Sequence, residues 1–372
     1  APECLIIQEK LLYYITSAER KVRQARLAAD AAKYQLKTKR QPALSKNQAE
    51  KLKDSITYYY TRIEYYLNLI HIYREIGDAI AFIYINRWDI KPLSFKESAG
   101  FISHKKGARS ERRALRYAFN KGLVVILNDL THCLRYGDIT VITIPQEGFA
   151  LIEIKSSKNR NRRVDNQLQK LQHIASYLAT DTTDDLYGEN APYSRHSAHA
   201  EIKDYTTELN ILISKAKTAG YGLAEVESGL YYLVITEFKE ELIDHVIRSF
   251  KGSPIVNIVN RTKQNNTAYY PFTLSIFDSE SLLAFYEGEF TIMIIIDSHI
   301  FLSGFANHGY ISEIDWASER PIILHCSEVE QDSIQTISIG NHFLGRIFAE
   351  FVSPLWFITE IAHKARQGEN LF

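Results

Sequence analysis

The feature that most constrains the fold of this chain is a pair of apolar runs separated by a short polar segment. Residues 139–144 read Ile-Thr-Val-Ile-Thr-Ile, and residues 149–154 read Phe-Ala-Leu-Ile-Glu-Ile. Pro145 and Gly148 bracket the segment between them. Runs rich in β-branched residues around such a turn predict a β-hairpin, and therefore an antiparallel sheet in this part of the chain.

Charged residues stand at the open end of this hairpin. Asp138 precedes the first strand, and Glu153 and Lys155 end the second. Side chains alternate between the two faces of a strand, so Glu153 and Lys155 share a face. A turn centred on Gln146–Glu147 would place Asp138 opposite Lys155, and Thr140 opposite Glu153. We therefore expect Asp138, Glu153 and Lys155 to converge on one patch.

Two carboxylates and a lysine in one patch are suited to metal-assisted hydrolysis. Carboxylate oxygens are the ligands that Mg²⁺ or Mn²⁺ prefers. A lysine beside them can orient a metal-bound water and offset charge on an attacked phosphate. The alternative is a surface salt bridge on an ordinary hairpin.

The pattern Gly-Asp138, then Glu153-Ile-Lys155 at the end of an apolar strand, resembles the PD-(D/E)xK superfamily of restriction-endonuclease-like nucleases. The resemblance covers about residues 104–236, with Gly137 where the family name has proline. It implies Mg²⁺ or Mn²⁺ as cofactor, Asp138 and Glu153 as metal ligands, and Lys155 as the catalytic lysine. It also implies an acid on a preceding helix, matched by Glu111 as a third ligand, and a polar catalytic residue on the following helix, matched by Gln167.

Charge is distributed unevenly along the chain. Residues 1–179 hold 31 lysines and arginines against 17 acids, a net +14, whereas residues 180–350 hold 11 against 25, a net −14. The basic half contains the hairpin, which predicts a polyanionic partner. We expect that partner to be nucleic acid, DNA rather than RNA. The basic runs beside the hairpin supply the expected nucleic-acid contacts: Lys105, Lys106, Arg109, Arg112, Arg113, Lys158, Arg160, Arg162 and Arg163.

Helical patterns dominate the first part of the chain. Residues 5–38 and 46–86 predict two long helices, with Ser45 as the N-cap of the second, and together an antiparallel hairpin. The second helix carries a tyrosine stripe suited to packing between helices or protomers, or to base stacking. The hairpin could therefore dimerise the protein or clamp nucleic acid.

The remaining segments predict mixed secondary structure. We expect a loop at 87–109, a helix at 110–121, a strand at 123–127 and a helix at 165–178. Further predictions are a loop at 180–200, a helix at 202–218, a hairpin at 222–236, β-like runs at 270–276, 290–296 and 321–325, and a helix at 342–366.

These elements predict an α/β protein with three domains. They are an N-terminal helical hairpin at 1–95, a mixed-sheet restriction-endonuclease-like core at 96–245, and a C-terminal α+β region at 246–372. The acidic C-terminal half is a candidate surface for a regulatory protein partner. No apolar stretch is long enough to cross a bilayer, and the three cysteines form no disulfide framework or zinc pattern, so we expect a cytoplasmic protein without a membrane partner.

The sequence thus favours a metal-dependent nuclease that hydrolyses phosphodiester bonds. An effector nuclease of an antiviral defence system, inactive until triggered, would fit the appended regions. The alternatives are a catalytically inactive nucleic-acid-binding protein of the same fold and a protein-interaction scaffold that assembles through its charge asymmetry.

Overall fold

The structure is a computed structural model that divides into two compact units, residues 1–175 and 176–372. The predicted core at 96–245 spans this division. The structure describes residues 2–38, 44–94, 100–105, 107–143, 148–154, 162–184, 193–194, 198, 200–262, 269–315, 318, 320–326 and 336–366.

In its described residues the first unit combines a long helical hairpin with a small sheet and three further α-helices. Helix α5 continues beyond residue 175 into the second unit. The elements are α1 (Pro2–Lys37), α2 (Lys46–Tyr84), α3 (Arg87–Ser94), α4 (Ala108–Asn120), β1 (Val124–Leu127), the 3-10 helix η1 (Asn128–Leu130), β2 (Ile139–Thr143), β3 (Gly148–Ile152) and α5 (Arg162–Thr180).

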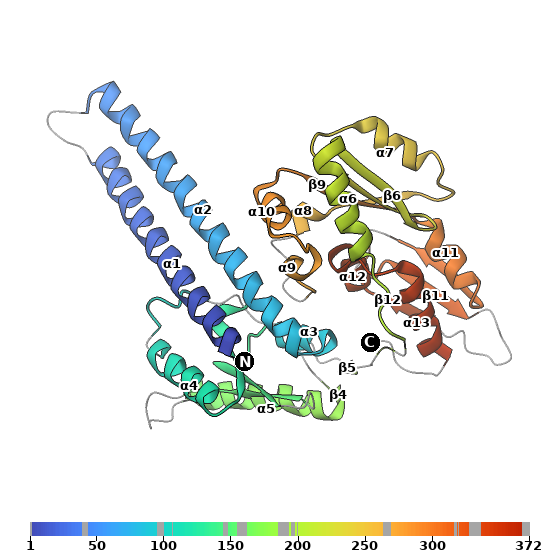
Figure 1. Ribbon diagram of the computed structural model, residues 1–372, viewed down its shortest axis with the longest axis horizontal. Helices are drawn as coiled ribbons and strands as arrows, with labels where there is room; N and C mark the ends of the chain where they lie inside the picture. The colour runs from blue at the N-terminus through green and yellow to red at the C-terminus, as the bar shows by residue number, and fades with distance from the viewer. Residues whose placement is uncertain are drawn as a thin grey trace. The chain divides into compact units, whose positions relative to one another are not determined.

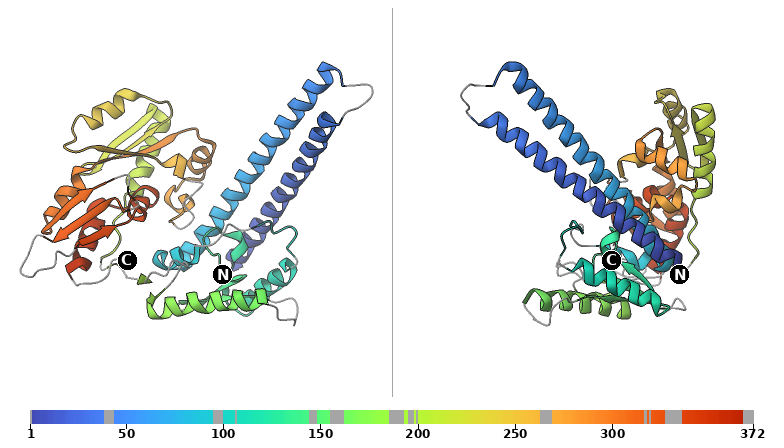
Figure 2. Two further views of the ribbon diagram at one scale, coloured as in Figure 1. Left: turned by 180° about the vertical axis from the view of Figure 1, so that it is seen from behind. Right: turned by 60° about the vertical axis from the view of Figure 1, so that its left-hand side comes forward.

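Helices α1 and α2 lie side by side as an antiparallel hairpin, which confirms the prediction (Figure 1, Figure 2). Ser45 caps α2 in a reciprocal capping box with Gln48, as its position predicts. The buried side of α1 follows the alternating three- and four-residue spacing of a coiled coil. Its members are Cys4, Gln8, Leu11, Ile15, Ala18, Val22, Ala25, Ala29 and Ala32.

The base of the hairpin packs onto the small sheet. The side-chain amide of Gln8 makes two hydrogen bonds to the backbone of β1. Its NH₂ group donates to the carbonyl of Val125 at 2.7 Å, and its oxygen accepts from the N–H of Leu127 at 2.8 Å. On α2, a Cβ at Gly77 would stand 1.9 Å from the carbonyl oxygen of Leu130 in η1. Only glycine permits this approach, so the hairpin and the sheet are parts of one packed unit.

The predicted β-hairpin is confirmed as β2 and β3 in an antiparallel sheet of order β1-β2-β3. The predicted register is wrong. Thr140 pairs with Leu151 and not with Glu153, and Ile139 pairs with Ile152, so Asp138 comes opposite Glu153 and not Lys155. The two registers differ by two positions, which puts the same side chains on the same faces, so alternation alone could not separate them. Lys155 itself lies outside the described residues.

In the described residues of the second unit there are three sheets with helices around them, including a four-stranded sheet of order β6-β7-β9-β8 and a three-stranded sheet of order β10-β11-β12. Its strands are β4 (Thr182–Thr183), β5 (Tyr193–Ser194), β6 (Tyr221–Glu227), β7 (Leu230–Ile235), β8 (Pro254–Ile258), β9 (Thr291–Asp297), β10 (Tyr310–Ile314), β11 (Ile322–Cys326) and β12 (Thr336–Ile339). Its helices are α6 (Thr206–Ala219), α7 (Glu240–Ile247), α8 (Val259–Thr262), α9 (Phe272–Ser275), α10 (Ser279–Glu287), α11 (His299–Ala306), α12 (His342–Glu350) and α13 (Pro354–Arg366).

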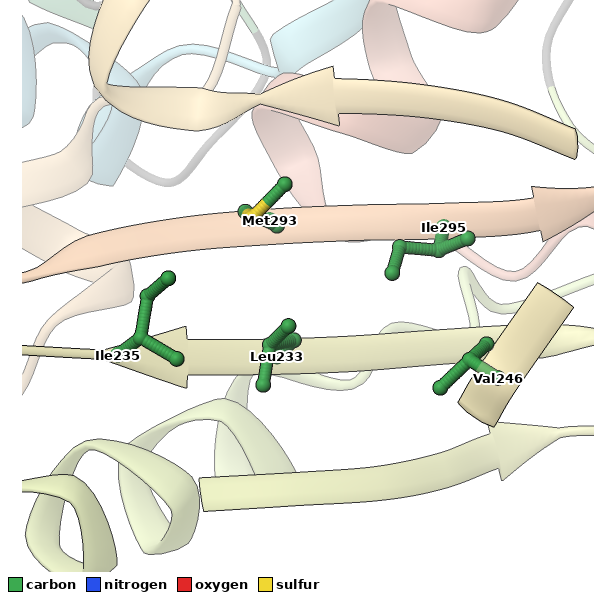
Figure 3. Packing of buried hydrophobic residues seen from close by; sticks show 5 residues of the cluster. All are labelled: Leu233, Ile235, Val246, Met293 and Ile295. Atoms are coloured by element: carbon green, nitrogen blue, oxygen red, sulfur yellow. The ribbon is translucent and has the colours of Figure 1, made fainter. Parts of the chain in front are cut away.

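One face of the four-stranded sheet forms an apolar core with α7. Leu233 and Ile235 of β7 and Met293 and Ile295 of β9 are buried together with Val246 of α7 (Figure 3). These strand residues alternate along β7 and β9, as expected for one face of a sheet. The hairpin predicted at 222–236 is confirmed as β6 and β7, but its sheet is this one and not that of β2 and β3.

Several secondary-structure predictions are wrong. Within the loop predicted at 180–200, residues 182–183 and 193–194 form the short paired strands β4 and β5. Residues 87–94, predicted as loop, form α3, and residues 272–275, predicted as β-like, form α9. The helix predicted at 342–366 is two helices, because Phe351 adopts a left-handed conformation (φ 57°) and Pro354 begins α13. Proline cannot continue a helix but is well suited to begin one.

The fold is therefore a mixed α/β structure with an N-terminal helical hairpin and an α+β C-terminal region, as the sequence predicts at this level. In the described residues the sheet beside the hairpin has three antiparallel strands, and the mixed sheet of a restriction-endonuclease-like core is not established by it. In the part of the chain that the structure describes, we find no helix with the length and apolar character needed to cross a membrane.

Candidate functional site

Asp138 is fixed at the open end of the β2–β3 ladder. Its N–H donates to the carbonyl of Ile152 at 2.8 Å, and its carbonyl accepts from the N–H of Asn128 at 3.0 Å. Gly137 precedes it with φ 76°, and a Cβ there would lie 3.0 Å from the carbonyl oxygen of Ile152. A glycine therefore fits this position and a proline would not, because proline is held near φ −65°.

Asp138, just before β2, and Glu153, just after β3, face the same cavity. Glu153 follows Ile152 directly, and both acids line a cavity of about 560 Å³. The Oδ2 atom of Asp138 accepts a hydrogen bond from the N–H of Ile154 at 2.8 Å. The predicted convergence of these two acids is therefore present in the structure, in a different register from the predicted one.

Glu111 reaches the same cavity from α4. Its side chain is on the inner face of that helix, and the residue is 2 % exposed. A Cβ at Gly107, where the chain enters α4, would stand 2.7 Å from its Oε1 atom, so the absence of a side chain there leaves room for the carboxylate. The third acid matched by the resemblance thus lies with Asp138 and Glu153.

The ammonium group of Lys105 occupies the centre of the acid cluster. Its Nζ atom is 3.0 Å from Oε1 of Glu111, 2.8 Å from Oδ2 of Asp129 and 2.9 Å from Oδ1 of Asp138. These three carboxylates come from α4, η1 and the residue before β2. We call Lys105, Glu111, Asp129 and Asp138 the ammonium cluster. The sequence predicts Lys105 as a nucleic-acid contact, whereas in the structure its ammonium group forms ion pairs with these three acids.

The electrostatics of the ammonium cluster are those of partly buried, mutually dependent charges. Burial alone would lower the pKa of Lys105, but Asp129 and Asp138 more than offset that effect and raise its pKa above the ordinary value. Burial raises the pKa of Glu111 to about 7, and the neighbouring Asp138 and Asp129 add to the rise that Lys105 opposes. Glu111 can therefore gain or lose a proton near neutral pH.

The loop that carries Lys105 is anchored by the helical hairpin. Glu19 of α1, fully buried, accepts hydrogen bonds from the N–H groups of Ile102 at 2.8 Å and Ser103 at 2.7 Å. The Nη2 atom of Arg74 of α2 lies 3.9 Å from Oε1 of Glu19 and donates to the carbonyl of Gly100 at 2.9 Å. The hairpin therefore positions one side of the site.

Sequence reasoning missed several residues of this cavity. Asp129 belongs to the ammonium cluster, and Lys170 of α5 adds a cation to the lining. Arg135 also lines the cavity. An acid two residues after the apolar strand Val124–Leu127 was the available signal for Asp129, because strand ends commonly carry site residues.

The expected nucleic-acid contacts divide into described and undescribed residues. Arg109, Arg112 and Arg113 of α4 are exposed, whereas Glu111 on the same helix is buried. Lys106, Lys158 and Arg160 lie outside the described residues, as do the side chains of Arg162, Arg163 and Gln167. Helix α4 thus directs an acid into the cavity and arginines to solvent.

In this structure the acids of the ammonium cluster surround the ammonium group of Lys105. Among the described residues, no three His, Cys, Asp or Glu side chains are arranged to hold a metal ion. Oxygens at 2.8–3.0 Å suit an ammonium nitrogen, whereas Mg²⁺ needs them at about 2.0–2.1 Å. The donor chemistry suits a hard divalent ion, but the carboxylates would have to close in and Lys105 would have to leave.

No protein-family model, no curated protein and no solved structure matches this chain.

Proposed function

We propose that this protein is a metal-dependent nuclease that hydrolyses phosphodiester bonds in nucleic acid, with DNA as the expected substrate. The observation that carries the proposal is the gathering of Glu111 of α4, Asp138 before β2 and Glu153 after β3 around one cavity. Such acids repel one another when ionised, so a site that gathers them is suited to a cation.

In this proposal each residue of the candidate site has its own role. Asp138, Glu153 and Glu111 would hold Mg²⁺ or Mn²⁺, which when bound supplies a polarised water and stabilises negative charge on phosphate. The exposed arginines of α4 would bind the phosphate backbone and lead it to the cavity. The resemblance implies that Lys155 is the catalytic lysine, which would orient the metal-bound water and offset charge on the attacked phosphate.

The substrate would meet the exposed arginines of α4. Arg109, Arg112 and Arg113 occupy successive exposed positions of α4, one turn or less apart. Residues 1–179 carry the net charge of +14. Exposed arginines on the helix that also carries the cavity acid Glu111 match a polyanion that brings its phosphates to a metal.

A second function is favoured by one observation. The acids already have a cation, Lys105, which would serve equally well in a protein that binds nucleic acid without cutting it. In that case the ammonium cluster stabilises the fold, and the exposed arginines of α4 bind the nucleic acid.

Cleavage and binding can be separated by one set of measurements. We would incubate the purified chain with supercoiled plasmid, single-stranded DNA and RNA in Mg²⁺, in Mn²⁺ and in EDTA, and measure binding in parallel. Cleavage that requires metal and stops in EDTA supports the nuclease. Salt-sensitive binding without cleavage in either metal contradicts it and supports the binding protein.

A further inference from the structure

We propose that Lys105 is a built-in competitor for the divalent ion, so that the site is held closed by its own ammonium until metal displaces it. The inference deepens the proposed function and rests on it for the identity of the ion as a divalent metal. It concerns how the site is regulated, and its tests do not depend on cleavage.

The first support is that the ammonium occupies the point on which three acids converge. Glu111, Asp129 and Asp138 each place an oxygen within 3.0 Å of Nζ. Two cations cannot share that position, because they would repel each other at contact distance. Metal binding by Glu111 and Asp138 therefore requires the ammonium to move.

The second support is that the backbone positions of the acids are fixed, while the side chain of the lysine is free to leave. Glu111 is in α4, Asp129 is in η1, and the backbone of Asp138 is hydrogen-bonded on both sides. Lys105 lies outside any helix or strand, and its side chain is 35 % exposed. Its loop is anchored through backbone groups of Ile102 and Ser103, which a rotation of the lysine side chain leaves in place.

The third support is the charge balance of the exchange. Without Lys105 the three acids would repel one another in a partly buried setting, so the ammonium stabilises the metal-free state. A divalent ion would replace that charge and add to it. The released ammonium would then lie at the solvent edge of the cavity, on the route by which phosphates arrive.

The first test uses the unmodified protein. We would acetylate it with an amine-reactive ester, with and without Mn²⁺, and measure modification of Lys105 by mass spectrometry. Lys53, exposed on α2, serves as the internal reference. We expect Mn²⁺ to raise the Lys105 to Lys53 ratio several-fold, because a displaced amine loses its three acidic partners. An unchanged ratio at Mn²⁺ concentrations that saturate binding would overturn the inference.

The second test removes the competitor. Lys105→Met keeps the length of the side chain without its charge, and Lys53→Met is the matched control. We expect Lys105→Met to bind Mn²⁺ at least about tenfold more tightly than the wild type in a calorimetric titration, since three ion pairs no longer oppose the metal. Adding Asp138→Asn should abolish that gain. Equal or weaker affinity in Lys105→Met contradicts the inference.

The two proposals fail in different ways. If Mn²⁺ displaces the Lys105 side chain but the protein cleaves no nucleic acid, the proposed nuclease function is wrong and the proposed competition between Lys105 and metal stands. A protein that cleaves in Mn²⁺ while Lys105 stays protected and Lys105→Met binds metal no better contradicts the competitor alone.

Discussion

The carboxylate of Asp138 accepts a hydrogen bond from the backbone N–H of Ile154 at 2.8 Å, so the acid before β2 holds the chain just beyond β3. The same carboxylate contacts Lys105 at 2.9 Å through its other oxygen. Asp138 therefore connects the Glu153-Ile154 segment to the ammonium cluster. It is at once a structural anchor and a candidate ligand.

Substitutions at Asp138 should separate these two roles. Asp138→Asn keeps an oxygen that can accept from Ile154, whereas Asp138→Ala leaves that N–H without its acceptor. We expect Asp138→Ala to be less stable than Asp138→Asn by about 1 kcal/mol in urea denaturation. Asp54→Asn, exposed on α2, should match the wild type. Equal stability of the two Asp138 variants would show that the hydrogen bond contributes nothing.

Gly137 should tolerate alanine poorly for two additive reasons. A left-handed backbone costs a non-glycine residue about 1–2 kcal/mol. At Gly137 the new Cβ would also stand 3.0 Å from the carbonyl oxygen of Ile152. Gly122 is a matched control, with φ 80° and nothing within 4 Å of its Cβ position.

We therefore expect Gly137→Ala to lower the free energy of unfolding by about 1 kcal/mol more than Gly122→Ala does, because overpacking adds to the backbone term. Thermal and urea denaturation of the two variants measure the difference. If both alanines destabilise equally, the close approach to β3 has no energetic consequence.

Stability in metal-free buffer should fall as the pH rises through the titration of Glu111. Its pKa is raised from about 4.5 to about 7 in the folded protein, so the folded state holds this proton more tightly than the unfolded state. Stabilisation by the proton is full below about pH 4.5 and is lost as the pH passes 7.

Glu111→Gln removes this dependence. Relative to the variant, the wild type should lose on the order of 2–3 kcal/mol of unfolding free energy between about pH 5 and pH 8, as the pKa shift implies. Glu64→Gln, exposed on α2, should run parallel to the wild type. Parallel curves for Glu111→Gln as well would contradict the raised pKa.

Glu19 should control the order of the loop that carries Lys105. Glu19→Ala removes the acceptor of two backbone N–H groups and leaves Arg74 near an empty position. We expect a loss of about 2–4 kcal/mol in unfolding free energy. We also expect faster amide hydrogen exchange at Ile102 and Ser103 than in Glu64→Ala. Unchanged exchange at these two amides would rule out the anchoring role.

Local patterns in the sequence predict much of this fold. The spacing of apolar residues and the Ser45 cap predict the two long helices, and alternation between turn residues predicts the hairpins at 139–154 and 222–236. These signals operate within a few residues of one another, so tertiary structure need not be known. The break at Pro354 was also visible in the sequence and was overlooked.

The site was only partly predictable, because its last components depend on tertiary contacts. Alternation places Asp138 and Glu153 on one face in either register, which is why their shared cavity survives an error in the register. The position of Lys105 depends on a buried carboxylate more than eighty residues earlier, Glu19, and no local pattern reports that contact. Asp129 likewise joins the cluster only once η1 packs beneath α2.

The most direct test of the central claim is the initial rate of plasmid nicking in Mn²⁺ by the wild type, Asp138→Asn and Asp54→Asn. We predict metal-dependent nicking by the wild type and by Asp54→Asn, and a loss of at least about a hundredfold in Asp138→Asn, where the proposed carboxylate ligand becomes an amide. Equal rates for all three proteins would contradict it, because the acids at the end of the β2–β3 hairpin would then have no part in the chemistry.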